Sequence, residues 1–272
     1  MALAKEIKKL VNHLYACLDL TSFANPYPKI SANILCKDNL KSIKLCLDSI
    51  KEHVYELVII DTGSTDGTYE FLEKYLPKNF ANYQLIKETE FKGYSFHRNQ
   101  AISASSGNWI LVLDSDEFLS KRLQDKLHHL CSSKIFSAYK LFRYWIDKIE
   151  DNKATAIFTK KFRGRYKSII RLFRKLPGVE YRGDIHEAVF GLEHKRIQTV
   201  NEKIAPMYHV DVAINSYKER QAKVLNRELL LKGSGHPEEY LPEDYGLKAQ
   251  EILAEDFELI SKTMGMTSQN NT

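Results

Sequence analysis

The sequence predicts an α/β fold with a mostly parallel central sheet and helices on both of its faces. Short apolar segments of strand length alternate with amphipathic segments of helix length from about residue 29 to residue 131. Strands that alternate with helices in this way form parallel sheets that are covered on both sides. The chain has 272 residues, of which 43% are hydrophobic, so one domain with a substantial core accounts for most of its length.

Four strands are predicted in this part of the chain, each apolar or alternating and each followed by a polar turn. They are ISANILC, ELVIID, YQLIKETE and NWILVLD. Helices are expected between them, one beginning near Thr68 and one, FHRNQAISAS, that Gly107 closes. The first and last predicted helices carry apolar residues at helical spacing, namely Leu40, Ile43, Leu47 and Ile50 in one and Leu119, Leu123, Leu127 and Leu130 in the other.

Acidic residues stand at the ends of two of these strands. Asp61 closes ELVIID, Asp114 closes NWILVLD, and Asp116 follows two positions later. In parallel sheets ligands bind beyond the carboxyl ends of the strands, so these acids are expected at a ligand site. If the backbone stays extended, Asp114 and Asp116 point to the same side. Two such carboxylates suit Mg²⁺ or Mn²⁺, shared with a phosphorylated substrate.

The turn TGSTDGT after the second strand contains glycines but does not have the pattern of a phosphate-binding loop. It lacks both the G-x-G-x-x-G order and the lysine of a P-loop. We expect a tight turn in which Ser64, Thr65 or Asp66 lies at the start of the next helix.

Composition excludes some classes of protein. The net charge of +5, from 40 basic and 35 acidic residues, is too small to indicate nucleic-acid binding. No apolar run approaches the roughly 20 residues of a membrane span, and the first residues do not form a signal peptide, so a cytoplasmic protein is expected. The four cysteines have no metal-binding spacing and are expected to be mainly buried thiols.

The second half contains a basic segment. Nine Lys or Arg residues and no acid lie between Lys153 and Lys175. Within it, Arg171 and Arg174 should lie on opposite faces of a strand, so that one of them faces a diphosphate or an anionic acceptor. The aromatic residues of the preceding YKLFRYW, including Trp145, belong either to the core or to a platform on which a sugar stacks.

Three segments in this order resemble glycosyltransferase family 2, whose members have the GT-A (Rossmann-like) fold. They are LVIIDTGSTDGT, HRNQAISASSGNWILVLDSDEFL and RLFRKLPGVEYRGDIHEAV, and the resemblance extends over about residues 30–211. It is strongest with small bacterial enzymes that glycosylate the lipopolysaccharide core or the cysteines of bacteriocin peptides. The resemblance implies an inverting, metal-dependent transfer of a sugar from a nucleotide-sugar, most simply a UDP-sugar, to a hydroxyl or thiol.

The resemblance also implies roles for residues of the first half. Asp61 is expected to contact the nucleotide base, and Arg98 to hold the nucleotide or its diphosphate. Asp114 is expected at the ribose or the metal, and Asp116 as the principal ligand of Mg²⁺ or Mn²⁺. Many relatives have Asn-Glu after the first strand where this chain has Asp38 and an asparagine, so the contact of Asp38 with the nucleotide is less defined.

Three residues of the second half complete the implied site. Glu187 occupies the place of the catalytic base, which takes the acceptor's proton during inversion. His186 either orients Glu187 or contacts the acceptor. His209 is expected to bind the metal or the diphosphate, although an isolated histidine is often structural.

Several alternatives remain open at this point. The acceptor is either a peptide Ser, Thr or Cys, or a glycan or glycolipid of the lipopolysaccharide type. A non-catalytic sugar-nucleotide-binding module and a nucleotidyltransferase are the competing functions. A nucleotidyltransferase normally has a Gly-rich basic loop after the first strand, and CKDNLKS is not one.

The predicted domain organisation has four parts. Residues 1–28 form an amphipathic helix, and residues 29–212 form the catalytic domain. That domain divides into a nucleotide-binding half, 29–120, and an acceptor half, 121–212. Residues 213–266 form a helical extension of two helices, and residues 267–272 a disordered tail. The terminal helices are expected either to cover the active site or to form a homodimer.

Overall fold

The computed structural model describes residues 28–157, 161–162, 165–166, 168–183, 187–201, 205–230 and 249–266. The predicted N-terminal helix, apart from residue 28, and the predicted tail at 267–272 lie outside these residues, as does Cys17. The homodimer through the terminal helices therefore stays a prediction.

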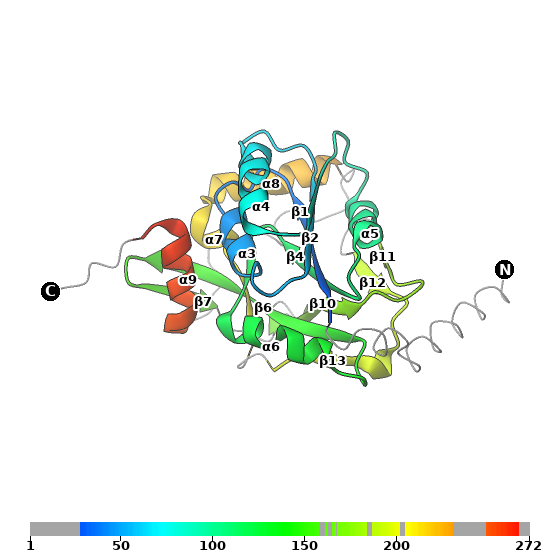
Figure 1. Cartoon of the computed structure of the whole chain (residues 1–272). Coiled ribbons are helices and arrows are strands. Elements are labelled where there is room, and N and C mark those ends of the chain that lie inside the picture. Colours follow the sequence, from blue (N-terminus) through cyan, green and yellow to red (C-terminus); the bar gives the residue numbers. More distant parts are fainter. Residues whose placement is uncertain are drawn as a thin grey trace.

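One large sheet organises the described part of the chain (Figure 1), and its first half is parallel. Its strands β1 (Ile30–Cys36), β2 (Glu56–Asp61), β3 (Tyr83–Lys87) and β4 (Trp109–Asp114) are the four predicted from the sequence. They lie in the order β4-β1-β2-β3, and each pair is parallel. The α/β fold class is thus confirmed.

The second half of the sheet is antiparallel. Strand β10 (Ser168–Arg174) pairs antiparallel with β4, and β6 (Ala138–Glu150) pairs antiparallel with β10. Strand β7 (Lys153–Ile157) continues the sheet beyond β6. Short strands join this half, namely β5 (Glu117–Leu119), β13 (Ile197–Thr199), β14 (Met207–His209) and β15 (Gln250–Glu251). Two separate two-stranded ladders are formed by β11 (Glu180–Arg182) with β12 (Ala188–Phe190), and by β8 (Lys161–Phe162) with β9 (Arg165–Tyr166).

Helices cover both faces of the parallel half (Figure 1). Helices α3 (Ile43–Asp48), α4 (Thr68–Asn79) and α6 (Lys121–Cys131) pack on one face, and α5 (Tyr94–Ala104) packs on the other. On β2, Leu57 and Ile59 pack with the first group, whereas Val58 and Ile60 pack with Ala101 of α5. Alternate residues of a strand point to opposite faces, so burial on both faces requires a continuous apolar segment such as ELVIID.

Two of the predicted helix boundaries need correction. Leu40 was expected on the face of the first helix, but it precedes α3 and is 42% exposed. Leu119 was expected on the face of α6, but it belongs to β5, which pairs with β14. Before α3 the chain leaves the sheet edge through a turn, whereas before α6 it first forms the short strand β5. The periodic apolar pattern does not distinguish such a turn from a first helical turn.

The C-terminal extension also differs in one element. Of the two predicted helices, the first is α8 (Tyr217–Leu230), preceded by the short α7 (Asp211–Ile214). The second, α9, begins only at Ala254 and ends at Met264, and residues just before it form β15 against β7. Strand β7 offers unpaired backbone groups at the edge of the sheet, and β15 pairs with them before the helix begins.

Three of the four cysteines, Cys36, Cys46 and Cys131, are buried free thiols, as predicted. No helix among the described residues has both the length and the apolar character that crossing a membrane requires.

Gly107 lies where β4 approaches β1 so closely that a side chain has no room. A Cβ atom there would be 2.5 Å from the carbonyl oxygen of Lys29 and 2.6 Å from Oγ of Ser31. The Gly107 N–H donates to that same Oγ at 2.9 Å. We therefore expect Gly107→Ala to lower the free energy of unfolding by about 1–3 kcal/mol, the usual cost of forcing atoms into a packed site.

Chemical denaturation of Gly107→Ala and the parent measures this effect. Ser103→Ala, on the exposed side of neighbouring α5, is the matched control and should stay within about 0.5 kcal/mol of the parent. Equal midpoints for all three proteins would contradict the close approach.

Candidate active site

The parallel half brings the predicted acids to one edge of the sheet. In the register of the strands, Asp61 lies beside Cys36 at the end of β1, and Asp114 lies beside Leu35. Asp38 follows two residues after the end of β1. The juxtaposition expected from strand topology is therefore present.

Asp61 and Asp38 organise the turn after β2. The Asp61 carboxylate is fully buried, and its Oδ1 accepts the N–H groups of Gly63 at 3.0 Å and Ser64 at 2.9 Å. The Asp38 carboxylate accepts the N–H of Thr65 at 2.6 Å. No part of the Asp61 side chain is accessible. Its contacts therefore favour a role in shaping this turn over the expected direct contact with the nucleotide base. The turn itself ends as predicted, since Asp66 accepts the N–H of the first residue of α4 at 2.9 Å.

Asp114 lies inside a cluster of arginines. Its Oδ1 accepts Nη2 of Arg98 at 2.7 Å, and its Oδ2 accepts Nη2 of Arg171 at 2.6 Å. Arg143 is 3.6 Å from the same carboxylate. Burial alone would raise the pKa of Asp114, but Arg171 and Arg98 hold that pKa well below its ordinary value. Asp114 is therefore an ionised carboxylate.

The third acid of DSDEF, Glu117, belongs to the same cluster. Its buried Oε1 accepts Arg171 Nη2 at 2.8 Å and Arg143 Nη1 at 3.0 Å. Its Oε2 accepts the backbone N–H of Asp114 at 2.9 Å. The cluster thus joins the end of β4 to β10 through Arg171 and to β6 through Arg143.

Arg98 connects this cluster to the predicted base. From α5 it donates Nη2 to Asp114 and Nε to Oε1 of Glu187, the latter at 2.7 Å. The Glu187 side chain is 14% exposed. His186, the other predicted residue of this segment, lies outside the described residues. Arg98 is thus placed between two of the expected functional carboxylates.

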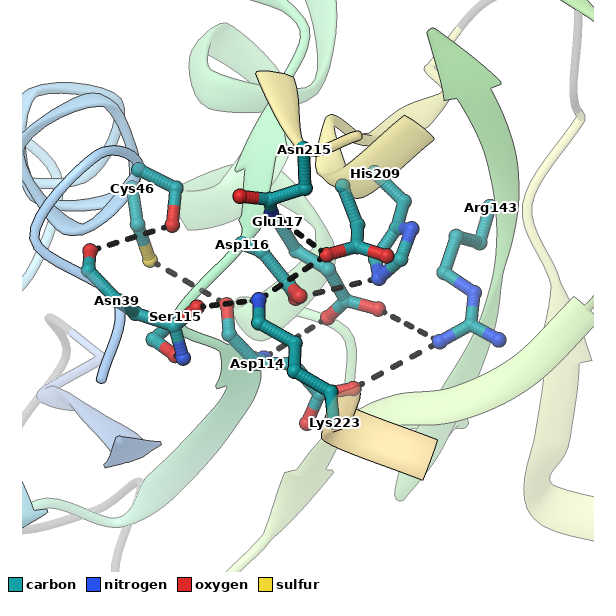
Figure 2. Close-up of polar contacts among 12 residues, drawn as sticks. Asn39, Cys46, Asp114, Ser115, Asp116, Glu117, Arg143, His209, Asn215 and Lys223 are labelled. Carbon is teal, nitrogen blue, oxygen red and sulfur yellow. Dashed lines mark hydrogen bonds and ion pairs between the residues drawn. The ribbon is translucent and has the colours of Figure 1, made fainter. Parts of the chain in front are cut away.

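Asp116 forms a separate pair with His209 (Figure 2). The backbone turns at Ser115 and Asp116, so Asp116 points away from the arginines and toward β14. Its Oδ1 is 3.2 Å from His209 Nε2, and both side chains are 17% exposed. Its carbonyl oxygen accepts the N–H of Val210 at 2.9 Å.

Burial and charge oppose each other in this pair. Burial would raise the pKa of Asp116, but His209 and, to a smaller extent, Lys223 lower it below the ordinary value. Burial would lower the pKa of His209, but the Asp116 carboxylate raises it. The pair is a carboxylate and an imidazole held in contact.

A divalent cation fits this pair in part. Among the described residues no three His, Cys, Asp or Glu side chains gather as a complete metal site. Asp116 and His209 supply an oxygen and a nitrogen ligand, and His209 Nδ1 is buried without a hydrogen-bond partner in the described part of the chain. Mg²⁺ and Mn²⁺ commonly take few protein ligands and complete their shell with phosphate oxygens and water. Asp114 was expected at the ribose or the metal, and the turn directs its carboxylate to the arginines.

The two predicted arginines of β10 do lie on opposite faces. Arg171 faces Asp114 and Glu117, whereas Arg174 donates Nη2 to the carbonyl of Ser133 at 2.6 Å and lies over the ring of Trp109 at 4.8 Å. Arg174 is therefore remote from the acids, and Arg171 is the one of the two arginines that lies at them.

Trp145 is partly exposed. It is the register partner of His209 on neighbouring β6, so it borders the pair of Asp116 and His209. Its position beside the site is consistent with either of its two expected roles.

Several site residues escaped the sequence analysis. Glu117 was visible as the third acid of DSDEF, but its role depends on Arg143 and Arg171, which are distant in the chain. Another four polar residues meet beside Asp116 and gave no motif, namely Asn39, Ser115, Asp211 and Lys223. Only spatial proximity identifies them.

A sheet covered on both faces, with carboxylates, arginines and a histidine at the carboxyl edge of its strands, defines the class of α/β proteins whose ligands bind at that edge. The chain belongs to glycosyltransferase family 2, because the family model described as "Glycosyl transferase family 2" matches residues 31–181.

Relatives of known sequence are longer than this chain. A TPR repeat-containing protein of Synechococcus elongatus is 31% identical over 163 residues, which are 59% of this chain and 35% of that protein. The SPbeta prophage-derived glycosyltransferase SunS of Bacillus subtilis is 26% identical over 168 residues, 61% of this chain and 36% of SunS. The chain thus matches about a third of the length of each. Residues 1–349 of S. aureus TarS align over 78% of this chain and 68% of that structure, with 16% identity and a TM-score of 0.48.

The buried pairs of Glu117 generate a stability prediction. Glu117→Gln removes the negative charge that Arg143 and Arg171 share, and it leaves part of their positive charge buried without a counterion. We expect the free energy of unfolding to fall by about 3 kcal/mol, as when one partner of a buried ion pair is removed.

Urea denaturation measures this change. Asp125→Asn, which breaks an exposed pair with Lys121 on α6, serves as control and should cost less than about 1 kcal/mol. A Glu117→Gln protein as stable as that control would show that the cluster contributes no more than a surface pair.

Proposed function

We propose that this chain is a metal-dependent, inverting glycosyltransferase that moves a sugar from a nucleotide-sugar to a hydroxyl or thiol. The observation that carries the proposal is the placing of two carboxylates with different partners at one sheet edge. Asp116 pairs with His209, and Glu187 is held by Arg98. The first pair suits a cation and the second suits proton transfer, and the transfer of a sugar from a nucleoside diphosphate uses both.

The charge of the site supports a requirement for a divalent cation. Five carboxylates of the site are joined by ion pairs, namely Asp114, Asp116, Glu117, Glu187 and Asp211. Their positively charged partners are three guanidinium groups and one ammonium group, namely Arg98, Arg143, Arg171 and Lys223. A histidine that binds a cation must be neutral, and with a neutral His209 this set carries one net negative charge. A nucleoside diphosphate adds further negative charge, so a divalent cation at Asp116 and His209 would offset the repulsion. When bound, the cation would stabilise charge on the departing diphosphate.

The arginines then have a positioning role. Arg98 and Arg171 are buried, and their charges are matched by Asp114, Glu117 and Glu187. Arg98 Nη1 has no hydrogen-bond partner in the described part of the chain. That nitrogen is a donor available for the nucleotide-sugar, in keeping with the role implied for Arg98. Asp114 fixes the guanidinium groups of Arg98 and Arg171 from the end of β4.

Glu187 is the residue proposed to take the acceptor's proton. Arg98 holds its Oε1, while Oε2 has no hydrogen bond within the described residues. A carboxylate fixed through one oxygen can accept a proton at the other. A hydroxyl acceptor would depend on this step more than a thiol, which is already partly ionised near neutral pH.

We propose a UDP-sugar as the donor. The support is a curated relative of Escherichia coli, 28% identical over 126 residues, whose name describes a UDP-Glc-dependent glucosyltransferase. The acceptor stays open between a peptide and a glycan. LpsC of Rhizobium meliloti, named a lipopolysaccharide core biosynthesis glycosyltransferase and 30% identical over 108 residues, supports a glycan acceptor. A panel of nucleotide-sugars, scored for Mn²⁺-dependent hydrolysis and thermal stabilisation, tests the donor and excludes a non-catalytic binding module if hydrolysis is seen.

Asp116→Asn tests the metal-binding pair. The amide keeps the shape of the side chain but removes the charge that binds Mg²⁺ or Mn²⁺, so Mn²⁺-dependent stabilisation by the preferred nucleotide-sugar should disappear. Thermal denaturation with and without Mn²⁺ and donor provides the measurement, and Asp125→Asn on α6 is the matched control for losing one carboxylate. Stabilisation equal to that of the parent, or donor hydrolysis that survives full chelation, would contradict the assignment of Asp116 as a metal ligand.

Glu187→Gln separates chemistry from binding. It removes the base while keeping a hydrogen-bond acceptor for Arg98, so kcat should fall by roughly 10²–10⁴-fold for a hydroxyl acceptor, with little change in donor affinity. Steady-state kinetics and donor titration on the same preparation measure both. Near-normal turnover with a hydroxyl acceptor would move the base to another residue.

A further inference from the structure

Helix α8 extends one lysine into the candidate active site. Lys223 Nζ lies 3.1 Å from Oδ1 of Asp211 and 3.2 Å from Oδ1 of Asn39. Asn39 in turn donates Nδ2 to Ser115 Oγ at 2.7 Å, and Ser115 is the residue between Asp114 and Asp116. Figure 2 shows the Lys223 side chain extending toward Asn39 and Ser115.

The surroundings of Lys223 differ from those of the arginines. Arg171 and Arg143 are directed to the buried carboxylate of Glu117 and to the partly exposed carboxylate of Asp114. Lys223 instead has one carboxylate and one neutral amide as partners, and its side chain is 37% exposed. An ammonium group has three donors and binds phosphate as a compact charge. Lys223 can therefore turn one of its donors to an incoming anion without leaving its position.

Helix α8 also contacts the rest of the domain through residues other than Lys223. Lys41, which follows β1, pairs with Glu219 of the helix at 2.6 Å. Three residues before Lys223, Arg220 is only 8% exposed, and residues three apart lie on the same helix face. Arg220 Nε and Nη1 are buried without hydrogen-bond partners among the described residues. The inward face of α8 thus carries two cations, one of them with unused donors.

We propose that Lys223 binds the diphosphate of the nucleotide-sugar, so that the C-terminal helix contributes a residue to the donor site. This inference rests on the proposed function and names an additional residue for it. Lys223 stands on the Asp116 side of the site, beside the pair expected to hold the cation, and the diphosphate is the part of the donor that must lie there. The charge of Lys223 would act together with the cation as the diphosphate departs. The residues after β14 would then be part of the catalytic unit.

Binding of nucleotides, measured by calorimetry in the presence of Mn²⁺, tests the proposal. UDP, GDP, ADP and CDP are titrated into the parent chain, and the one that binds best is then compared with its own nucleoside. Lys223→Gln should weaken binding of that diphosphate about tenfold, in the range expected for losing a charge-assisted hydrogen bond. Binding of the nucleoside, which carries no phosphate, should not change. Lys223→Arg, which retains the charge, should recover most of the affinity.

Two control variants separate this role from a structural one. Lys218→Gln removes a charge from an exposed position of the same helix, and Lys41→Gln removes the exposed ion pair between Lys41 and Glu219 of the helix. Neither should weaken the diphosphate more than about twofold, because exposed pairs contribute little. If Lys41→Gln weakens it as much as Lys223→Gln, or if Lys223→Gln weakens nucleoside and diphosphate equally, Lys223 only docks the helix and the proposal is overturned.

The failures of the two proposals are distinguishable. A parent chain that binds none of the four nucleoside diphosphates with Mn²⁺ overturns the proposed function, and the role of Lys223 with it. A parent chain that binds one of them, together with a Lys223→Gln variant of equal affinity, overturns the role of Lys223 alone.

Discussion

The ionised carboxylate of Asp114 at the end of β4 is the interaction on which the rest of the site depends. It accepts hydrogen bonds from Arg98 of α5 and Arg171 of β10, while its own N–H donates to Glu117. Three parts of the fold therefore meet at one group. The buried charges of Arg98, Arg171 and Glu117 are tolerated only when they are paired and hydrogen-bonded, so these groups must be in place together.

This constraint explains why the two halves of the sheet form one unit. The parallel half supplies Asp114 and the acids of the neighbouring strands, and the antiparallel half supplies Arg171 and Arg143. Arg98 extends the network to Glu187, so the expected base is held by the residue that also pairs with Asp114. Buried charged networks are sensitive to the loss of any member. The position of Glu187, the proposed catalytic base, thus depends on the contacts between the parallel and antiparallel halves of the sheet.

The pair of Asp116 and His209 lies outside that network because the backbone turns after Asp114. The turn places Asp114 and Glu117 among guanidinium groups and places Asp116 beside His209. Similar residues in different surroundings can take different roles, because burial and nearby charge set their ionisation. Lys223 and Asp211 border the pair of Asp116 and His209 and connect it to the C-terminal helices.

The sequence by itself determined the α/β class, the four parallel strands and the edge at which Asp61 and Asp114 meet. Strand periodicity and the direction of parallel strands are local properties, and they are sufficient for those conclusions. Order and spacing of three motifs also predicted the family. Only the tertiary structure decided that Asp61 is buried in its own turn, that Arg174 lies far from the acids, and that Glu117 and Lys223 belong to the site. These positions depend on contacts between residues distant in the chain, such as Arg171 with Glu117 and Lys223 with Asn39, and no local pattern encodes the distance between them.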